Sequence, residues 1–200
     1  MRKIPAVNIA IFASGGGSNA RKILAHQSQQ DSYQTSLLIT NSPKSGVFQI
    51  GHDFGIPAMK LSPTQYRDGA FLTSLLAHFK VDVIVLAGYL KLIPADLVKA
   101  FPKRILNIHP SLLPKYGGKG MYGMKVHENV ILYREKASGI TIHYVNEIYD
   151  EGEVILQKEV EIAPQWTAIE LQKEVQKLEH RFYPEIVEKV CLGVQNEGNK

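Results

Sequence analysis

Apolar residues alternate along the chain between short runs and longer stretches of helical spacing. The short β-rich runs predict strands at residues 8–13, 36–40, 82–87 and 105–108. Helical periodicity between these runs predicts helices at 18–29, 46–54, 66–79 and 125–134. Residues 83–86 are apolar at consecutive positions, which is typical of a strand covered on both faces of a parallel sheet. The alternation therefore predicts an α/β fold with helices on both faces of a sheet.

The pattern changes after Ala137. Two further apolar runs, residues 140–145 and 154–160, flank an acidic turn at 150–152 and predict an added β-hairpin. Apolar residues then recur at spacings of three and four and predict a long C-terminal helix: Leu171, Val175, Leu178, Phe182, Ile186 and Val190. Pro184 should kink or interrupt that helix. The predicted fold class is α/β: a doubly wound, mostly parallel Rossmann-like sheet with a C-terminal β-hairpin and a long C-terminal helix.

Composition narrows the functional classes. A chain of 200 residues with 44% hydrophobic and 21% charged residues is typical of one globular domain. The net charge is +4, from 23 Lys+Arg and 19 Asp+Glu, and the basic residues are spread along the chain. This fits a small anionic substrate and no nucleic-acid or membrane partner. No apolar run is long enough to cross a bilayer. The single cysteine, Cys191, excludes an internal disulfide and fits a reducing cytoplasm.

A glycine-rich turn follows the first predicted strand. Gly15, Gly17 and Ala20 satisfy the spacing of a dinucleotide fingerprint, and amide groups at a helix N-terminus favour an anion. A plain strand-to-helix turn capped by Ser18 explains the glycines about equally well. The second strand ends in Thr40 and Asn41, without the acid that binds a ribose in dinucleotide folds. If an anion binds here, we expect a single phosphate.

A second motif, residues 107–114, directly follows a buried strand, where open α/β sheets bind ligands. Alternation places Asn107 and His109 on one face, where an amide donor and an imidazole can hold an oxyanion and move a proton. Either residue alone would be read as a structural one. From the neighbouring sequence alone, Asp150 is interpreted as a turn residue and Glu179 as a residue on the solvated edge of a helix. His127 lacks the second histidine of a zinc helix, so no metal is assigned.

These segments together resemble the phosphoribosylglycinamide formyltransferases, a family of folate-dependent formyltransferases. The resemblance covers residues 8–190 and is carried by residues 13–19, 85–90, 107–116, 138–145, 149–152 and 178–184. It implies transfer of the formyl group of 10-formyltetrahydrofolate to the amine of glycinamide ribonucleotide, in de novo purine biosynthesis, without a metal. Its implied partners are these small molecules, its implied location is the cytoplasm, and a monomer or a homodimer is expected.

The resemblance also implies a role for each site residue. The catalytic set would be Asn107, His109 and Asp150. Residues implied for the ribonucleotide are Gly17, Ser18 and Asn19 at the phosphate, Arg67 near it, and Glu179 at the ribose. Residues implied for the folate are Tyr89, Leu90, Lys91, Leu92, Val145 and Asn146. The loop at 117–123 is longer than in the commonest members, so no contact is transferred to it.

Three rival functions remain at this point. A formyltetrahydrofolate hydrolase would use the same three residues on water, and methionyl-tRNA formyltransferase would use them on a tRNA-linked amine. We expect neither, because the chain lacks the regulatory or RNA-binding domain that these enzymes commonly add. A passive nucleotide-binding module would need neither Asn107 nor His109. The sequence predicts a single formyltransferase domain at 1–200, with phosphate binding in about 1–100 and catalysis and folate binding in about 101–200.

Overall fold

The computed structural model describes residues 6–197, and seven strands within that range form one sheet. Their order is β3-β2-β1-β4-β5-β6-β7. The bounds are Val7–Phe12 (β1), Tyr33–Thr40 (β2), Ala58–Lys60 (β3), Val83–Leu86 (β4), Ile105–His109 (β5), Ala137–Tyr144 (β6) and Val154–Glu161 (β7). Neighbouring strands from β3 to β5 are parallel, whereas β6 and β7 are antiparallel. The mostly parallel sheet with an added hairpin is confirmed.

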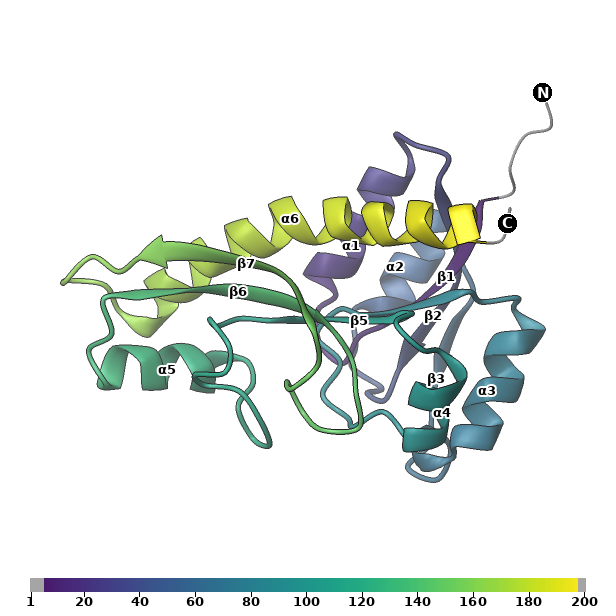
Figure 1. Ribbon diagram of the computed structural model, residues 1–200, viewed down its shortest axis with the longest axis horizontal. Coiled ribbons are helices and arrows are strands. Elements are labelled where there is room, and N and C mark those ends of the chain that lie inside the picture. Colours follow the sequence, from purple (N-terminus) through teal and green to yellow (C-terminus); the bar gives the residue numbers. More distant parts are fainter. Residues whose placement is uncertain (1–5, 198–200) are drawn as a thin grey trace.

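Helices cover both faces of this sheet (Figure 1). Their bounds are Ser18–Gln27 (α1), Val47–Phe54 (α2), Gly69–His78 (α3), Ala95–Ala100 (α4), Met124–Leu132 (α5) and Ala168–Glu197 (α6). Side chains of α1, α2, α5 and α6 pack into one apolar cluster, and those of α3 and α4 pack into a second. The doubly wound arrangement predicted from the sequence is therefore confirmed.

Alternation along the central strands explains the two clusters. Ile9 and Ile11 of β1 belong to the first cluster, whereas Ala10 and Phe12 belong to the second, and all four are fully buried. Successive side chains of a strand point to opposite faces, so a strand between two helix layers must be apolar at every position. Burial of each large side chain stabilises the fold by about 1.5–3 kcal/mol. The layers hold the carboxyl ends of the parallel strands in fixed positions.

The third predicted helix is wrong at its start. Tyr66 and Arg67 lie in a separate 3-10 turn, Gln65–Arg67 (η1), and α3 begins only at Gly69. Asp68 explains the break, because its carboxylate accepts a hydrogen bond from the backbone N–H of Phe71 at 2.9 Å and caps α3. The short elements β3 and α4 were also missed.

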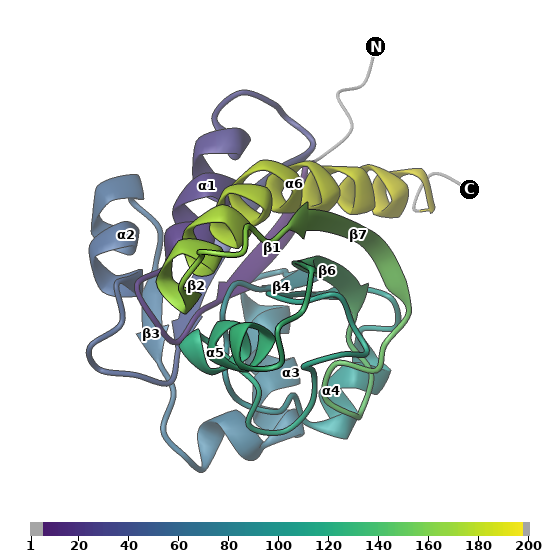
Figure 2. The same ribbon diagram turned by 90° about the vertical axis from the view of Figure 1, so that its left-hand side faces the viewer.

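The predicted interruption at Pro184 is also wrong, because α6 runs unbroken from Ala168 to Glu197 across the sheet (Figure 2). Proline removes one helical hydrogen bond at a cost of about 3 kcal/mol, and packing on the sheet offsets this loss. Beside it, the buried Tyr183 donates its hydroxyl hydrogen to the carbonyl oxygens of Leu86 at 2.9 Å and Leu106 at 3.2 Å. The helix is therefore attached directly to β4 and β5. Cys191 is buried on its inner face.

Candidate active site

A cleft of about 580 Å³ opens at the carboxyl ends of β1, β4 and β5. Strand order changes direction here, since β1 pairs with β2 on one side and with β4 on the other. This switch point is where doubly wound sheets bind ligands. All the site residues predicted from the sequence line the cleft except Arg67. Among residues 6–197, no helix is long and apolar enough to cross a membrane, and no cluster of three or more His, Cys, Asp or Glu could hold a metal ion.

The glycine turn forms one end of the cleft. Gly17 adopts φ +76°, a conformation that favours glycine, and a Cβ at this position would lie 2.5 Å from Cδ1 of Ile50, whose side chain would have to move. Gly17 precedes the first turn of α1 and Ser18 is its first helical residue, which corrects the alternative in which Ser18 caps the helix. Hydrogen bonds from Ser45 and Gly46 to the carbonyl oxygen of Gly15 fix the turn. The turn thereby holds the first amide groups of α1 in an arrangement that favours an anion.

Helix α6 supplies the facing wall at this end of the cleft. Asn19 donates from Nδ2 to Oε2 of Glu179 at 2.8 Å, and Gln176 donates from Nε2 to Oγ of Ser18 at 3.3 Å. Glu179 is not the solvated helix edge that local sequence suggested. Burial raises the pKa of its carboxyl group, although the hydrogen bond from Asn19 and nearby His109 oppose the shift. A polar wall thus faces the helix N-terminus, and local sequence gave no sign of Gln176.

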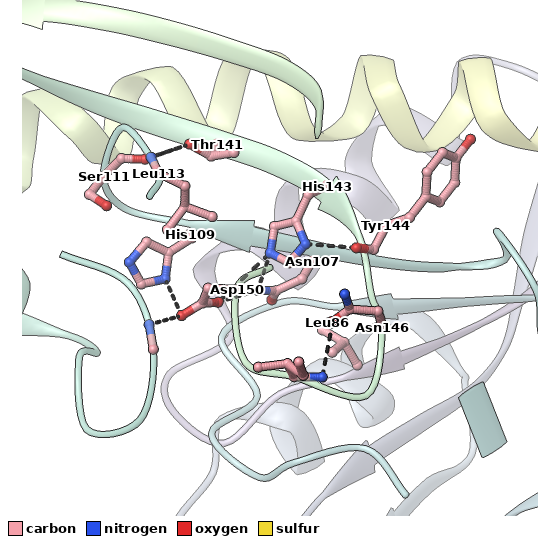
Figure 3. A network of polar contacts seen from close by, with 12 residues as sticks. Leu86, Asn107, His109, Ser111, Leu113, Thr141, His143, Tyr144, Asn146 and Asp150 are labelled. Atoms are coloured by element: carbon pink, nitrogen blue, oxygen red, sulfur yellow. Dashed lines mark hydrogen bonds and ion pairs between the residues drawn. The ribbon is translucent and has the colours of Figure 1, made fainter. Parts of the chain in front are cut away.

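The catalytic candidates meet at the end of β5 (Figure 3). Asn107 and His109 are two positions apart, and their partners across the antiparallel pairing are His143 and Thr141 of β6. Nδ1 of His109 lies 3.4 Å from Oδ2 of Asp150, and Nδ2 of Asn107 lies 3.4 Å from its Oδ1. Two of the three predicted residues, Asn107 and His109, therefore each contact the third, Asp150.

Asp150 sits in the loop between β6 and β7 with φ +59°, a turn conformation. The local interpretation of Asp150 as a turn residue is thus confirmed for its backbone, while its carboxylate enters the cleft and its catalytic role stays a prediction. Burial alone would raise the pKa of this carboxyl group, but a hydrogen bond from His109, the adjacent imidazole of His143, the charge of His109 and the N–H of Gly118 hold it well below its usual range. Asp150 is accordingly an anion at any pH near neutrality.

His143 was missed by sequence reasoning. It donates from Nδ1 to the carbonyl oxygen of Tyr144 at 2.8 Å, which leaves Nε2 to accept a hydrogen bond from Nδ2 of Asn107 at 3.1 Å. This contact directs the Asn107 amide group, with its nitrogen toward Asp150. The predicted strand at 140–145 contains His143, but its position opposite Asn107 depends on a strand register that the sequence did not predict.

His127 of α5 also lines the cleft and is buried. Burial, together with a smaller effect of the nearby charge of His109, lowers the pKa of its imidazole to about 4. Its Nδ1 has no hydrogen-bond partner among the described residues. His127 is thus a neutral imidazole at neutral pH with one nitrogen that a ligand could bind.

The other end of the cleft is apolar at its mouth. Leu90, Leu92, Tyr122 and Ile148 are each at least 43% exposed and line it together with Val145 and Asn146. Tyr89 packs edge-to-face on Phe12 with ring centroids 5.2 Å apart, beneath this surface. Exposed apolar side chains around a cleft are typical of a binding site for an apolar part of a ligand.

Arg67 lies apart from these residues. Its guanidinium group is over the ring of Tyr66, 5.6 Å from the centroid, and the ammonium group of Lys91 lies at the same distance from that ring. Lys91 lines the cleft and Arg67 does not. The contact of Arg67 with a phosphate stays a prediction.

Comparison with known proteins places this geometry in a wider context. The formyl transferase family matches residues 7–187 of the chain. Phosphoribosylglycinamide formyltransferase of Bacillus subtilis is 36% identical over 196 residues, which cover 96% of this chain and 97% of that protein. The chloroplastic phosphoribosylglycinamide formyltransferase of Arabidopsis thaliana is 45% identical over 92% of this chain, which spans only 65% of the plant protein. The chain likewise spans 60% of the protein of that name from Vigna unguiculata.

Solved structures agree with the sequence relatives. Glycinamide ribonucleotide transformylase 1 from Symbiobacterium toebii superimposes with a TM-score of 0.86 at 30% identity, covering 96% of this chain and 90% of that one. Phosphoribosylglycinamide formyltransferase from Bacillus halodurans gives a TM-score of 0.82 at 37% identity, covering 92% of this chain and 94% of that one.

Proposed function

Because the chain belongs to the formyl transferase family, we propose that it transfers the formyl group of 10-formyltetrahydrofolate to the primary amine of glycinamide ribonucleotide. The products would be formylglycinamide ribonucleotide and tetrahydrofolate. The proposal depends mainly on one observation: Asn107, His109 and Asp150 meet in a cleft that also holds a helix N-terminus suited to a phosphate. A passive nucleotide-binding module would not need these three residues.

The proposed reaction begins when the amine nitrogen attacks the formyl carbon. A new C–N bond forms, and the carbonyl oxygen of the tetrahedral intermediate becomes negative. Asn107 has two amide hydrogens, and only one has a close acceptor, Nε2 of His143 at 3.1 Å. The other makes a long contact of 3.4 Å with Asp150 and would turn to the oxyanion. Single donors of this kind typically lower such barriers by about 3–4 kcal/mol.

Proton transfer completes the proposed reaction. Protonated His109 would share the hydrogen on Nδ1 between Asp150, at a long 3.4 Å, and the oxyanion. The carboxylate of Asp150 favours this imidazolium by its opposite charge. The proton lost by the attacking amine would pass through this pair to the departing folate nitrogen, directly or through water, as the C–N bond to the folate breaks.

The two ends of the cleft fit the two substrates. The N-terminus of α1, with Gly17, Ser18 and Asn19, would bind the phosphate, and Glu179 would accept hydrogen bonds from the ribose hydroxyls. The apolar mouth, with Tyr89, Leu90, Lys91, Leu92, Val145 and Asn146, would bind the pterin and its aromatic extension. Backbone groups of these residues offer donors and acceptors for the pterin edge.

The wider assignments are proposals of the same standing. We propose that residues 1–200 act as a single domain, whose first half binds the phosphate and whose second half supplies catalysis and much of the folate site. Its partners would be these small molecules, without nucleic acid or membrane, and it would act in a reducing cytoplasm as a monomer or homodimer. The buried free thiol of Cys191 fits that location.

One assay tests the reaction. Loss of 10-formyltetrahydrofolate is followed with glycinamide ribonucleotide, with its dephosphorylated riboside, and with neither. We expect turnover with the ribonucleotide and a much higher KM for the riboside. Turnover without any amine would instead identify a hydrolase, and no turnover at all would leave a passive binding protein. Equal KM values for the ribonucleotide and the riboside would contradict the phosphate site.

A further inference from the structure

The imidazole of His109 lies between two hydrogen-bond acceptors, one near each ring nitrogen, at unequal distances. Nε2 lies 2.8 Å from the carbonyl oxygen of Tyr116, and Nδ1 lies 3.4 Å from Oδ2 of Asp150. A carbonyl oxygen can only accept, so Nε2 carries a hydrogen. The first distance is that of a full hydrogen bond, whereas the second is at the outer limit. The hydrogen on Nε2 is therefore held, and the hydrogen on Nδ1 is the one free to exchange.

The carbonyl group of Tyr116 is itself held by contacts outside the cleft. Tyr116 has φ +57°, a conformation that bulky residues rarely adopt unless their surroundings impose it. Its hydroxyl group donates to Oε1 of Glu135 at 2.9 Å, and Lys115 donates to the same carboxylate at 2.9 Å. Ser111 donates to the carbonyl oxygen of Lys115 at 2.7 Å and fixes the preceding peptide.

From this chain of contacts we propose that Tyr116, anchored by Glu135, is a positioning residue that sets the tautomer of His109 and makes Nδ1 its proton-exchanging nitrogen. The hydrogen bond made by one ring nitrogen of a histidine decides which nitrogen carries the proton. Without the carbonyl oxygen, the carboxylate of Asp150 would draw the hydrogen to Nδ1, because charged acceptors are the stronger ones. Nδ1 could then no longer take up a proton. This inference rests on the proposed function for its kinetic consequence and on the structure alone for the tautomer.

The test uses the full chain and reads the tautomer and the kinetics separately. Nitrogen-15 spectra of histidine-labelled protein at alkaline pH, with His109 assigned from His109→Gln, should show one protonated ring nitrogen, Nε2. In Tyr116→Phe, which keeps the ring and loses the hydroxyl group, the two signals should converge as the tautomers mix. We expect kcat of Tyr116→Phe to fall about tenfold, which is the lower end of the activity loss when a contact that orients a functional histidine is removed. KM for both substrates should stay within about twofold of the wild-type value.

Matched variants separate positioning from folding. Glu135→Ala should behave like Tyr116→Phe, whereas Glu135→Gln keeps an acceptor for the hydroxyl group and should restore kcat to within about threefold of the wild type. Tyr133→Phe is the control, because the Tyr133 ring lies beside Tyr116 at 6.2 Å but is 68% exposed. An unchanged His109 spectrum in Tyr116→Phe would overturn the inference, whatever happens to kcat. Absence of formyl transfer by the wild type would overturn only the proposed function, since the spectra do not depend on it.

Discussion

Replacing Asp150 by asparagine should test the pairing with His109 most directly. The variant keeps the size of the side chain and an oxygen that can accept the N–H of Gly118, now 2.8 Å from Oδ2. It removes the negative charge that lies 3.4 Å from Nδ1 of His109. The loop should therefore keep its structure while the imidazolium loses its counter-charge.

The size of the effect follows from this distance. Two unit charges 3.4 Å apart attract by about 5 kcal/mol at an effective dielectric constant of about 20. The Asp150 side chain is 11% exposed, so solvent screens only a small part of this attraction. If about 4 kcal/mol is lost from the transition state, the chemical step should slow by about three orders of magnitude. Binding of both substrates should change little, because the charge acts where the intermediate forms.

Single-turnover kinetics with excess enzyme would measure the chemical step for the wild type, Asp150→Asn, His109→Ala and the double variant. Groups that act as one unit lose activity together, so the double variant should be little slower than the slower single one. Glu151→Gln is a matched control, because it removes the neighbouring exposed carboxylate. Fully multiplicative losses, or near-normal turnover in Asp150→Asn, would refute the pairing.

Three further outcomes are expected. Glu179→Gln should weaken ribonucleotide binding about tenfold and leave folate binding nearly unchanged, and calorimetry showing the opposite selectivity would contradict the ribose contact. Gly17→Ala should also weaken ribonucleotide binding about tenfold, since the left-handed conformation costs about 1–2 kcal/mol and the new Cβ meets Ile50, while equal binding would mean that the turn does not hold the phosphate. The pKa of His127 is lowered from its ordinary value of 6.5 to about 4, so the unfolded chain takes up a proton more readily than the folded one between these pH values. The contribution of His127 to the free energy of unfolding is therefore fully present above pH 6.5 and is lost as the pH falls toward 4. Urea unfolding at pH 7 and pH 5 should therefore show a loss of about 2 kcal/mol that is absent in His127→Gln, and equal losses would refute this assignment.

Much of the fold followed from local patterns because burial in this sheet acts at every position of a strand. Val83 to Leu86 are all buried, so their apolar run was informative without any knowledge of neighbours. Short elements were not predicted, because their residues are less buried and form no apolar run. In β3, Ala58 and Met59 are only partly buried and Lys60 is exposed, so no run marked the strand. At Pro184 the local penalty was real, but packing of α6 on the sheet outweighed it.

The site could be predicted only where its residues lie close in sequence. Asn107 and His109 share a strand face, so alternation was enough to pair them. Their link to Asp150 depends on the register of β6 against β5 and on the loop that follows. The loop packs closely at Gly152, since a Cβ there would lie 1.7 Å from the carbonyl oxygen of Tyr144. Local sequence does not show that the backbone at Gly152 packs this closely against Tyr144. Only the family resemblance indicated Asp150 as a site residue.

In the proposed function, backbone groups bind the phosphate and side chains carry out catalysis, so substitutions at the two ends of the cleft should have different effects. The proposed phosphate end would use amide groups of α1, so its main demand would be the conformation of Gly17 and the close packing around it. The proposed catalytic end would use the side chains of Asn107, His109 and Asp150, each of which contacts another member of the set. Side-chain changes near the phosphate should therefore alter binding gradually, whereas any change in the catalytic set also alters the hydrogen bonds of its neighbours. Losses at the two ends should add in free energy, because the two groups share no contact, while losses within the catalytic set should not.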